Sequence, residues 1–237
     1  MQKYQCDKCK DTGAILYIEP DDLSPGGTVE RWGDCECVKA KRYKEMYERA
    51  GLAKAFENSS FDNFNTDKKP PIVKAAKSIC QQYAKSFDGK HSLALLGQVG
   101  SGKTHLCTAT TNELLKKLIP VLYMPYREVL TLLKQSMTKN YGEEETVYQK
   151  EIQRFKAAPV LYIDDLYKGK ITDSDKNIMF EIINYRYQYS KPIIISSEFT
   201  TDKMLDFDEA IGSRIIQMCK GFIIELHGLE LNHRLAV

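Results

Sequence analysis

The sequence has no long apolar run and no marked excess of charge of either sign. Among its 237 residues, 34 Lys and Arg stand against 32 Asp and Glu, which gives a formal net charge of +2. No apolar stretch approaches the roughly 20 residues that a membrane-spanning helix needs, and the first residues lack the apolar core of a signal sequence. We therefore expect a cytoplasmic protein without a membrane segment. Any contact with DNA or RNA has to come from a local basic surface.

Internal repeats and low-complexity tracts are also missing. A content of 43% hydrophobic and 28% charged residues is typical of a globular protein and excludes disorder as the main state. The length allows one full-sized core and a small additional module. We predict a cysteine-rich module with a basic connecting helix at 1–50, a linker at 51–69 and a larger domain at 70–237.

Four of the seven cysteines gather in the first 37 residues, as Cys6-x-x-Cys9 and Cys35-x-Cys37. The span between the two pairs contains two β-like runs, 14–18 and 28–32, so the pairs are expected to close the ends of a hairpin. Four thiolates complete a tetrahedral Zn²⁺ site with no position left for water, which is typical of structural zinc. Free thiols or a redox pair remain the alternatives. The other cysteines, Cys80, Cys107 and Cys219, lie in apolar helical patterns and are expected to be inert core thiols.

Five short apolar runs follow one another from residue 70 onward, and helix-like sequence separates them. The runs cover 92–96, 121–124, 160–163, 193–196 and 222–226. They show no alternation of apolar and polar residues, as expected of strands that are covered on both faces. The pattern predicts an α/β fold with a parallel five-stranded sheet flanked by helices.

A glycine-rich segment follows the first of these runs and precedes a helical pattern at 105–118. It reads GQVGSGKT and matches G-x-x-x-x-G-K-[ST], in which backbone N–H groups curl around the phosphates of a nucleotide. The lysine supplies a mobile positive charge, and the threonine offers a hydroxyl to Mg²⁺ while the positive end of the helix faces the phosphates. We predict ATP and Mg²⁺ as ligands, bound by Gly97, Gly100, Ser101, Gly102, Lys103 and Thr104.

Two carboxylates, Asp164 and Asp165, end the apolar run at 160–163. ATPases with a phosphate loop present acids beside the phosphates from a strand of this kind, called Walker B. We expect Asp164 to hold Mg²⁺ together with Thr104, and Asp165 to polarise the attacking water. Many ATPases carry Glu at this second position. The side chain of Asp is one methylene shorter, so hydrolysis is expected to be slow.

Four segments resemble the DnaC/DnaI-type replicative helicase loaders: GQVGSGKTHL, YIDDLYKGK, INYRYQYSKPIIISSE and IGSRI. The resemblance extends over most of the chain, because such loaders often begin with a cysteine-rich metal module, and CDKCKDTG and GDCEC look like its two knuckles. It implies an AAA+ core that forms an ATP-dependent homo-oligomer with ATP at the subunit boundaries. Arg214, on the helix after the fourth core strand, is then the candidate for the arginine that reaches the ATP of the neighbouring subunit.

The sequence departs from the loader pattern at the end of the fourth apolar run. Thr-Ser-Asn is common there, whereas this chain has Ser196-Ser197-Glu198. Ser197 is the preferred candidate for a residue that senses the γ-phosphate, and Glu198 the weaker one. No helical lid is expected, because the chain stops at Val237. Arg234 is a candidate to replace the arginine of such a lid, and a fraying basic tail is the alternative.

Two groups of basic residues are candidates for binding single-stranded DNA through its phosphates. The first lies on the connecting helix, where interleaved Glu45 and Glu48 favour a solvated face instead. The second lies in the region 126–156, where initiator-like AAA+ relatives place DNA-contacting elements, and it is the preferred site. The groups are Lys39, Lys41, Arg42, Lys44 and Arg49, and Arg127, Lys134 and Lys139.

These observations favour an ATP-dependent loader whose zinc module binds a hexameric DnaB-type replicative helicase. Its AAA+ core would help deliver that ring onto single-stranded DNA, and ATP hydrolysis would be stimulated by the helicase or the DNA. One alternative is an IstB-like transposition helper that acts with a transposase on duplex DNA. The other is a small-molecule P-loop kinase, although the chain shows no lid with acceptor-binding arginines.

Overall fold

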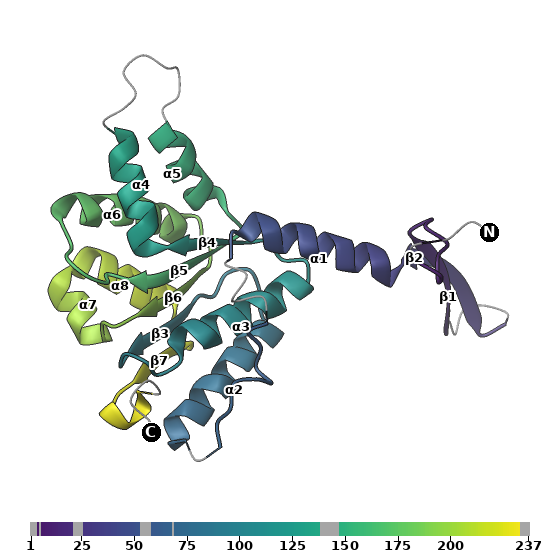
Figure 1. Cartoon of the computed structure of the whole chain (residues 1–237), viewed down its shortest axis with the longest axis horizontal. Coiled ribbons are helices and arrows are strands. Elements are labelled where there is room, and N and C mark those ends of the chain that lie inside the picture. The colour runs from purple at the N-terminus through teal and green to yellow at the C-terminus, as the bar shows by residue number, and fades with distance from the viewer. Residues whose placement is uncertain are drawn as a thin grey trace. The chain divides into compact units, whose positions relative to one another are not determined.

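The computed structural model describes residue 4 and residues 6–20, 26–52, 58–67, 69–137 and 147–232 (Figure 1). The chain divides into two compact units, Met1–Glu48 and Arg49–Val237. The division lies two residues before the predicted end of the cysteine-rich module at residue 50. No helix in the described ranges has the length and apolar character that a membrane crossing requires.

The smaller unit is built on an antiparallel hairpin. Strand β1 (Ala14–Pro20) pairs with β2 (Thr28–Asp34), and Leu16 lies directly opposite Trp32. Helix α1 (Glu36–Ala50) begins two residues after β2 and ends at Gly51, whose φ of +75° is the left-handed conformation that glycine adopts at a helix end. Both β-like runs were therefore predicted correctly, to within two residues, and the predicted connecting helix is present.

The larger unit contains a five-stranded parallel sheet, as predicted. Its strands are β3 (Leu93–Gly97), β4 (Val121–Pro125), β5 (Val160–Leu166), β6 (Ile193–Ser197) and β7 (Ile223–Leu226). Their order in the sheet is β4-β5-β6-β3-β7, and every neighbouring pair is parallel. Strand β3, which leads into the phosphate loop, lies between β6 and the edge strand β7, so the loop emerges at the carboxyl edge of the sheet between the ends of these two strands.

Helices cover both faces of this sheet (Figure 1). Helices α2 (Pro71–Lys85) and α3 (Lys103–Lys116) lie on one side. The other side carries α4 (Tyr126–Met137), α5 (Val147–Ala157), α6 (Asp173–Gln188), α7 (Thr201–Phe207) and α8 (Glu209–Met218). A short 3₁₀ helix, η2 (Leu229–Leu231), follows β7. The buried apolar residues of the sheet and of these helices form the core, and Cys80, Cys107 and Cys219 are buried within the unit as expected.

One arginine is fully buried in this core. Among the residues that the structure describes, no carboxylate pairs with the guanidinium of Arg186, on α6. It donates instead to backbone carbonyls at the end of α5 and in the loop before β6. The acceptors are the carbonyls of Phe155, Lys156, Ala158, Pro159 and Pro192, at 2.6–3.4 Å. Arg186 therefore satisfies the carbonyls that the end of α5 leaves without helical partners.

The segment 58–67, which the sequence suggested as part of a linker, packs on the larger unit. Phe61 and Phe64 are buried, and the backbone carbonyls of Ser59 and Ser60 accept hydrogen bonds from α3 side chains. The donors are the Nδ2 of Asn112, at 2.8 Å, and the Nε2 of His105, at 3.0 Å. The described part of 51–69 is thus a structured part of the larger unit, because its aromatic side chains gain burial there.

Candidate nucleotide-binding site

The phosphate loop turns sharply from β3 into α3. Gly97 has a φ of +98°, and a Cβ at this position would lie 2.4 Å from the carbonyl oxygen of Leu226 on β7. Gly102 has a φ of +90°, and a Cβ there would lie 2.6 Å from the ring of Phe64. Only glycine fits either place. Between them Ser101 is buried and its hydroxyl donates to the carbonyl of Gln98 at 2.7 Å, which holds the turn.

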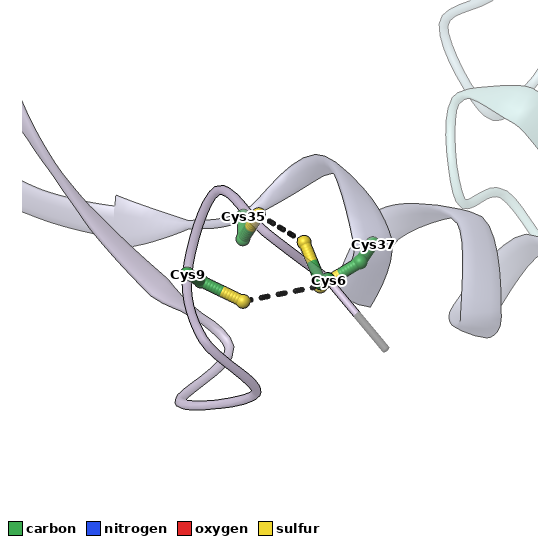
Figure 2. Close-up of side chains that lie close together, drawn as sticks. All are labelled: Cys6, Cys9, Cys35 and Cys37. Carbon is green, nitrogen blue, oxygen red and sulfur yellow. Dashed lines mark hydrogen bonds between the residues drawn. The ribbon is translucent and has the colours of Figure 1, made fainter. Parts of the chain in front are cut away.

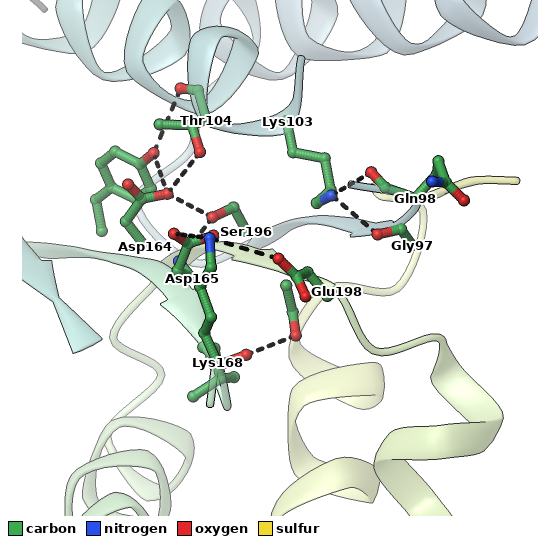
Figure 3. Close-up of polar contacts among 12 residues, drawn as sticks. Gly97, Gln98, Lys103, Thr104, Asp164, Asp165, Lys168, Ser196 and Glu198 are labelled. Carbon is green, nitrogen blue, oxygen red and sulfur yellow. Dashed lines mark hydrogen bonds and ion pairs between the residues drawn. The ribbon is translucent and has the colours of Figure 1, made fainter. Parts of the chain in front are cut away.

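Lys103 lies at the start of α3 with its side chain folded back over the loop (Figure 3). Its Nζ donates to the carbonyl oxygens of Gly97, at 2.9 Å, and Gln98, at 2.6 Å. The residue is only 6% exposed, and burial lowers its pKa. When a nucleotide binds, this ammonium group can give up its hydrogen bonds to the two carbonyl oxygens and donate to phosphate oxygens instead.

Asp164 is buried at the end of β5 and accepts hydrogen bonds from four hydroxyl groups (Figure 3). Thr104 donates at 3.1 Å and Tyr162 at 2.9 Å to its Oδ1, which Ser196 also contacts, while Tyr123 donates to its Oδ2 at 3.1 Å. Burial, together with the charge of Asp164, raises the pKa of both tyrosines, so both hydroxyls keep their protons. A carboxylate and a threonine hydroxyl side by side are hard oxygen donors, which fit Mg²⁺.

Asp165 follows with a φ of +55°, the left-handed conformation. Its N–H donates to the hydroxyl of Ser196 at 2.9 Å, and its Oδ2 accepts from the Nζ of Lys168 at 2.9 Å. The same Nζ lies 3.4 Å from the Oε1 of Glu198, at the end of β6. The hydrogen bond to Asp165 raises the pKa of Lys168. The structure thus brings Lys103, Thr104, Asp164, Asp165 and Glu198 to one edge of the sheet.

The four cysteines of the smaller unit lie together (Figure 2). Their sulfur atoms are all within 4.8 Å of one another, with 3.8 Å between Cys6 and Cys35 and 3.5 Å between Cys9 and Cys37. The edge of a tetrahedron of sulfurs around Zn²⁺ is about 3.8 Å, given a Zn–S bond of about 2.3 Å. The arrangement therefore fits zinc. Cys9 and Cys35 are buried, as ligands of a structural zinc site are expected to be.

A model of the IstB-like ATP binding proteins matches residues 36–222 of this chain. The chain belongs to that family. The phage-like element PBSX protein XkdC of Bacillus subtilis (strain 168) is 37% identical over 246 residues, which cover 98% of this chain and 87% of XkdC. The replicative helicase loader DnaC of Escherichia coli (strain K12) is 25% identical over 181 residues, 75% of this chain and 69% of DnaC.

Solved structures show the same fold as this IstB-like chain. The crystal structure of the DnaC helicase loader has a TM-score of 0.61 at 23% identity and covers 74% of this chain and 100% of its own. The crystal structure of DnaI has a TM-score of 0.60 at 22% identity, with 76% and 94% covered. Fold, family and phosphate loop together identify an ATPase of the AAA+ class, as the resemblance in the sequence implied.

Ser197 does not reach the acidic pair of this IstB-like site. Its hydroxyl donates to the carbonyl of Leu166 at 2.7 Å and accepts the N–H of Phe199 at 3.1 Å, on the opposite side of β6 from Asp164. Successive side chains of a strand point to opposite faces, so Ser196 rather than Ser197 contacts Asp164. The role of Ser197 as a sensor of the γ-phosphate stays a prediction.

Arg214 lies on α8 and contacts α6 rather than the phosphate loop of its own chain. Its Nε donates to Asn184 at 3.0 Å, and its guanidinium lies 5.3 Å from the ring centre of Phe180 and 5.6 Å from that of Tyr187. An arginine that acts in the site of a neighbouring subunit has to lie outside its own site, so this position is compatible with the prediction. Arg234 lies outside the described residues.

In the preferred DNA-binding group of Arg127, Lys134 and Lys139, Lys134 is occupied by an ion pair within the chain. The Nζ of Lys134 lies 2.7 Å from the buried carboxylate of Asp175, so its charge is neutralised within the chain. Lys139 lies outside the described residues. Arg127 is exposed and stays a candidate for DNA contact. On α1, Arg42 is paired with Asp34, whereas Lys41 and Arg49 are exposed. The side chains of Lys39 and Lys44 lie outside the described part.

Sequence reasoning missed four residues of the site: Tyr123, Tyr162, Ser196 and Lys168. The two tyrosines are paired in register on β4 and β5, with ring centres 5.2 Å apart, and in the sequence they read as core residues of apolar strands. For Tyr162 a weak signal was available, because a buried tyrosine hydroxyl needs a hydrogen-bond partner and Asp164 follows two residues later on the same strand.

Proposed function

We propose that this protein is an ATP-dependent helicase loader. It would bind a hexameric DnaB-type replicative helicase and help deliver it onto single-stranded DNA during replication initiation. The observation that carries the proposal is the union, in one chain, of an AAA+ phosphate site and a separate cysteine module. The similarity to DnaC, a replicative helicase loader, along 75% of the chain supports it.

Each residue of the site would have a separate role in ATP hydrolysis. Backbone N–H groups of the phosphate loop and Lys103 would hold the phosphates of ATP, and Thr104 and Asp164 would hold Mg²⁺, which neutralises phosphate charge. Asp165 would polarise a water molecule whose oxygen attacks the γ-phosphorus. The bond to the bridging oxygen then breaks, its electron pair stays on ADP, and the proton of the water passes to the carboxylate.

A homo-oligomer would add one further residue to each site, supplied by the neighbouring subunit. Arg214 would stabilise the charge on the γ-phosphate bound by the neighbouring subunit, since a guanidinium is permanently charged and matches phosphate oxygens as a fork. Hydrolysis would be slow in the isolated protein and stimulated by the helicase or by single-stranded DNA, for which Arg127 and the exposed basic residues of α1 are the candidate contacts.

The hairpin of the smaller unit offers a surface for the helicase. Leu16, Ile18 and Trp32 are exposed by 43%, 67% and 72%. They share one face, because Leu16 is paired with Trp32 and Ile18 is two residues further along the strand. Clustered exposed apolar side chains are typical of protein-binding surfaces, and we assign this face to the helicase.

Light scattering after size-exclusion chromatography tests the proposal directly. The protein is mixed with its cognate replicative helicase and ATP, and the experiment is repeated with Trp32→Thr and with the pair Cys6→Ser and Cys9→Ser. We expect a complex with wild type that all these changes abolish. Tyr189→Thr is the matched control, because Tyr189 is an aromatic residue of the ATPase unit that is 62% exposed. Absence of a wild-type complex under every nucleotide condition would reject the loader.

A transposition helper is the second candidate, favoured by the match to the IstB-like family model. Such a protein would act with a transposase on duplex DNA, whereas a loader would act on single strands. ATPase activity measured with each form of DNA separates the two. Stimulation by duplex DNA alone would favour the transposition helper.

A further inference from the structure

Three charged side chains meet at the carboxyl ends of β5 and β6 (Figure 3). The ammonium group of Lys168 lies 2.9 Å from the Oδ2 of Asp165 and 3.4 Å from the Oε1 of Glu198. One cation therefore stands between two carboxylates. The three side chains are 34–40% exposed, so the lysine can move from one partner to the other without crossing a packed core.

The fold holds Lys168 in this place. Its N–H donates to the carbonyl of Asp165 at 3.0 Å, which closes a turn in which Asp165 and Tyr167 have φ values of +55° and +63°. Tyr167 is only 2% exposed, and its ring packs 4.9–5.9 Å from those of Tyr126, Phe199 and Phe207. This buried anchor fixes the turn, so the ion pair is not a chance contact of a freely moving lysine.

The site of this ion pair borders the phosphate loop. Glu198 lines a cleft of about 290 Å³ together with Gly97, Gln98 and Lys203. Asp165 is the carboxylate to which we assign the polarisation of the attacking water. The Oδ2 of Asp165 is occupied by the ammonium group of Lys168, so it is not free to accept a hydrogen bond from water.

We propose that Lys168 is a positioning residue that restrains Asp165, and that Glu198 is the second acceptor to which the ammonium group moves when Asp165 is released for turnover. The inference rests on the ATPase part of the proposed function and is independent of the helicase. It gives a role to the carboxylate at the position where the loader pattern has an amide. Because the hydrogen bond to Asp165 raises the pKa of Lys168, the lysine stays charged at physiological pH and the restraint persists.

Steady-state ATPase measurements on the full chain test the inference. Lys168→Met should raise kcat roughly two- to fivefold with the KM for ATP unchanged, as expected from the loss of one partly exposed ion pair. Glu198→Gln should lower kcat by a similar factor, because Asp165 then remains the only charged partner of the lysine. The double variant should behave as Lys168→Met, since Glu198 has no function without the lysine. Lys170→Met is the matched control, because Lys170 is exposed two residues further on and should leave kcat unchanged.

Each other outcome overturns the inference. A kcat of Lys168→Met at or below that of wild type would assign the lysine to the phosphates of ATP, or to no function in turnover. Additive effects in the double variant would show that Lys168 and Glu198 act separately. The assay contains only the protein, ATP and Mg²⁺, so failure to bind a helicase leaves its result unaffected.

Discussion

We expect Cys9→Ser to unfold the smaller unit and leave the ATPase unit folded. Among the residues of the smaller unit whose side chains the structure describes, only Cys9 and Cys35 are buried, so no apolar core holds the hairpin there. A structural zinc site contributes about 10–16 kcal/mol of folding free energy. That is at least as large as the roughly 5–15 kcal/mol that stabilises a typical domain, and loss of one thiolate removes most of it.

The single tryptophan of the chain makes this measurable. Trp32 lies on β2, so its fluorescence anisotropy reports the smaller unit alone. The wild type should carry one zinc ion per chain and lose anisotropy when a strong chelator is added, whereas Cys9→Ser should show the low value from the start. Binding of a fluorescent ATP analogue should change less than twofold in either case.

The matched control is Cys219→Ala, which removes a buried thiol from the larger unit. It should retain its zinc and its anisotropy. Full zinc content or unchanged anisotropy in Cys9→Ser would refute the reasoning, because the hairpin would then be held by something other than the four thiolates.

Three further outcomes are expected. Asp165→Asn should bind ATP as wild type does and turn it over at least about 100-fold more slowly in a steady-state assay, as loss of a general base predicts; normal turnover would remove Asp165 from the mechanism. Tyr123→Phe should raise the Mg²⁺ concentration for half-maximal activity roughly tenfold, because Asp164 loses a donor that orients it, whereas an unchanged requirement would contradict that role. In thermal unfolding, Arg186→Met should cost about 3–5 kcal/mol by leaving buried carbonyls without a donor, whereas the exposed Arg154→Met should cost under about 0.5 kcal/mol; equal losses would contradict this account.

The strands and the phosphate loop were predictable because each depends on local sequence. Uninterrupted apolar runs gave all five strands of the parallel sheet to within a few residues, since strands covered on both faces need them. The loop was predictable because its glycines and its lysine stand at fixed spacing. The cysteine pairs indicated a cluster for the same reason, and the structure brings their sulfurs together.

Orientations within the site depend on pairing between distant segments and were not predictable. The parallel register sets Ile163 of β5 level with Ile195 of β6, so the next residues, Asp164 and Ser196, face each other, and this register depends on long-range pairing. Likewise, the ion pair between Lys134 and Asp175 joins α4 to α6, so no local pattern distinguishes that lysine from a DNA contact. Phe61 and Phe64 are buried beside residues of α2 and α3, which are distant in the sequence, so no local pattern indicated their burial.

The order of the strands has a consequence for synthesis of the chain on the ribosome. The neighbours of β3 in the sheet are β6 and β7, which begin about a hundred residues or more after it. Strands β4, β5 and β6 can pair in the order in which they emerge, but β3 has no partner until residue 193 has been made and is enclosed only after residue 226. Since β3 leads directly into the phosphate loop, the nascent chain acquires its ATP site last, and contacts of such long sequence separation make that step slow.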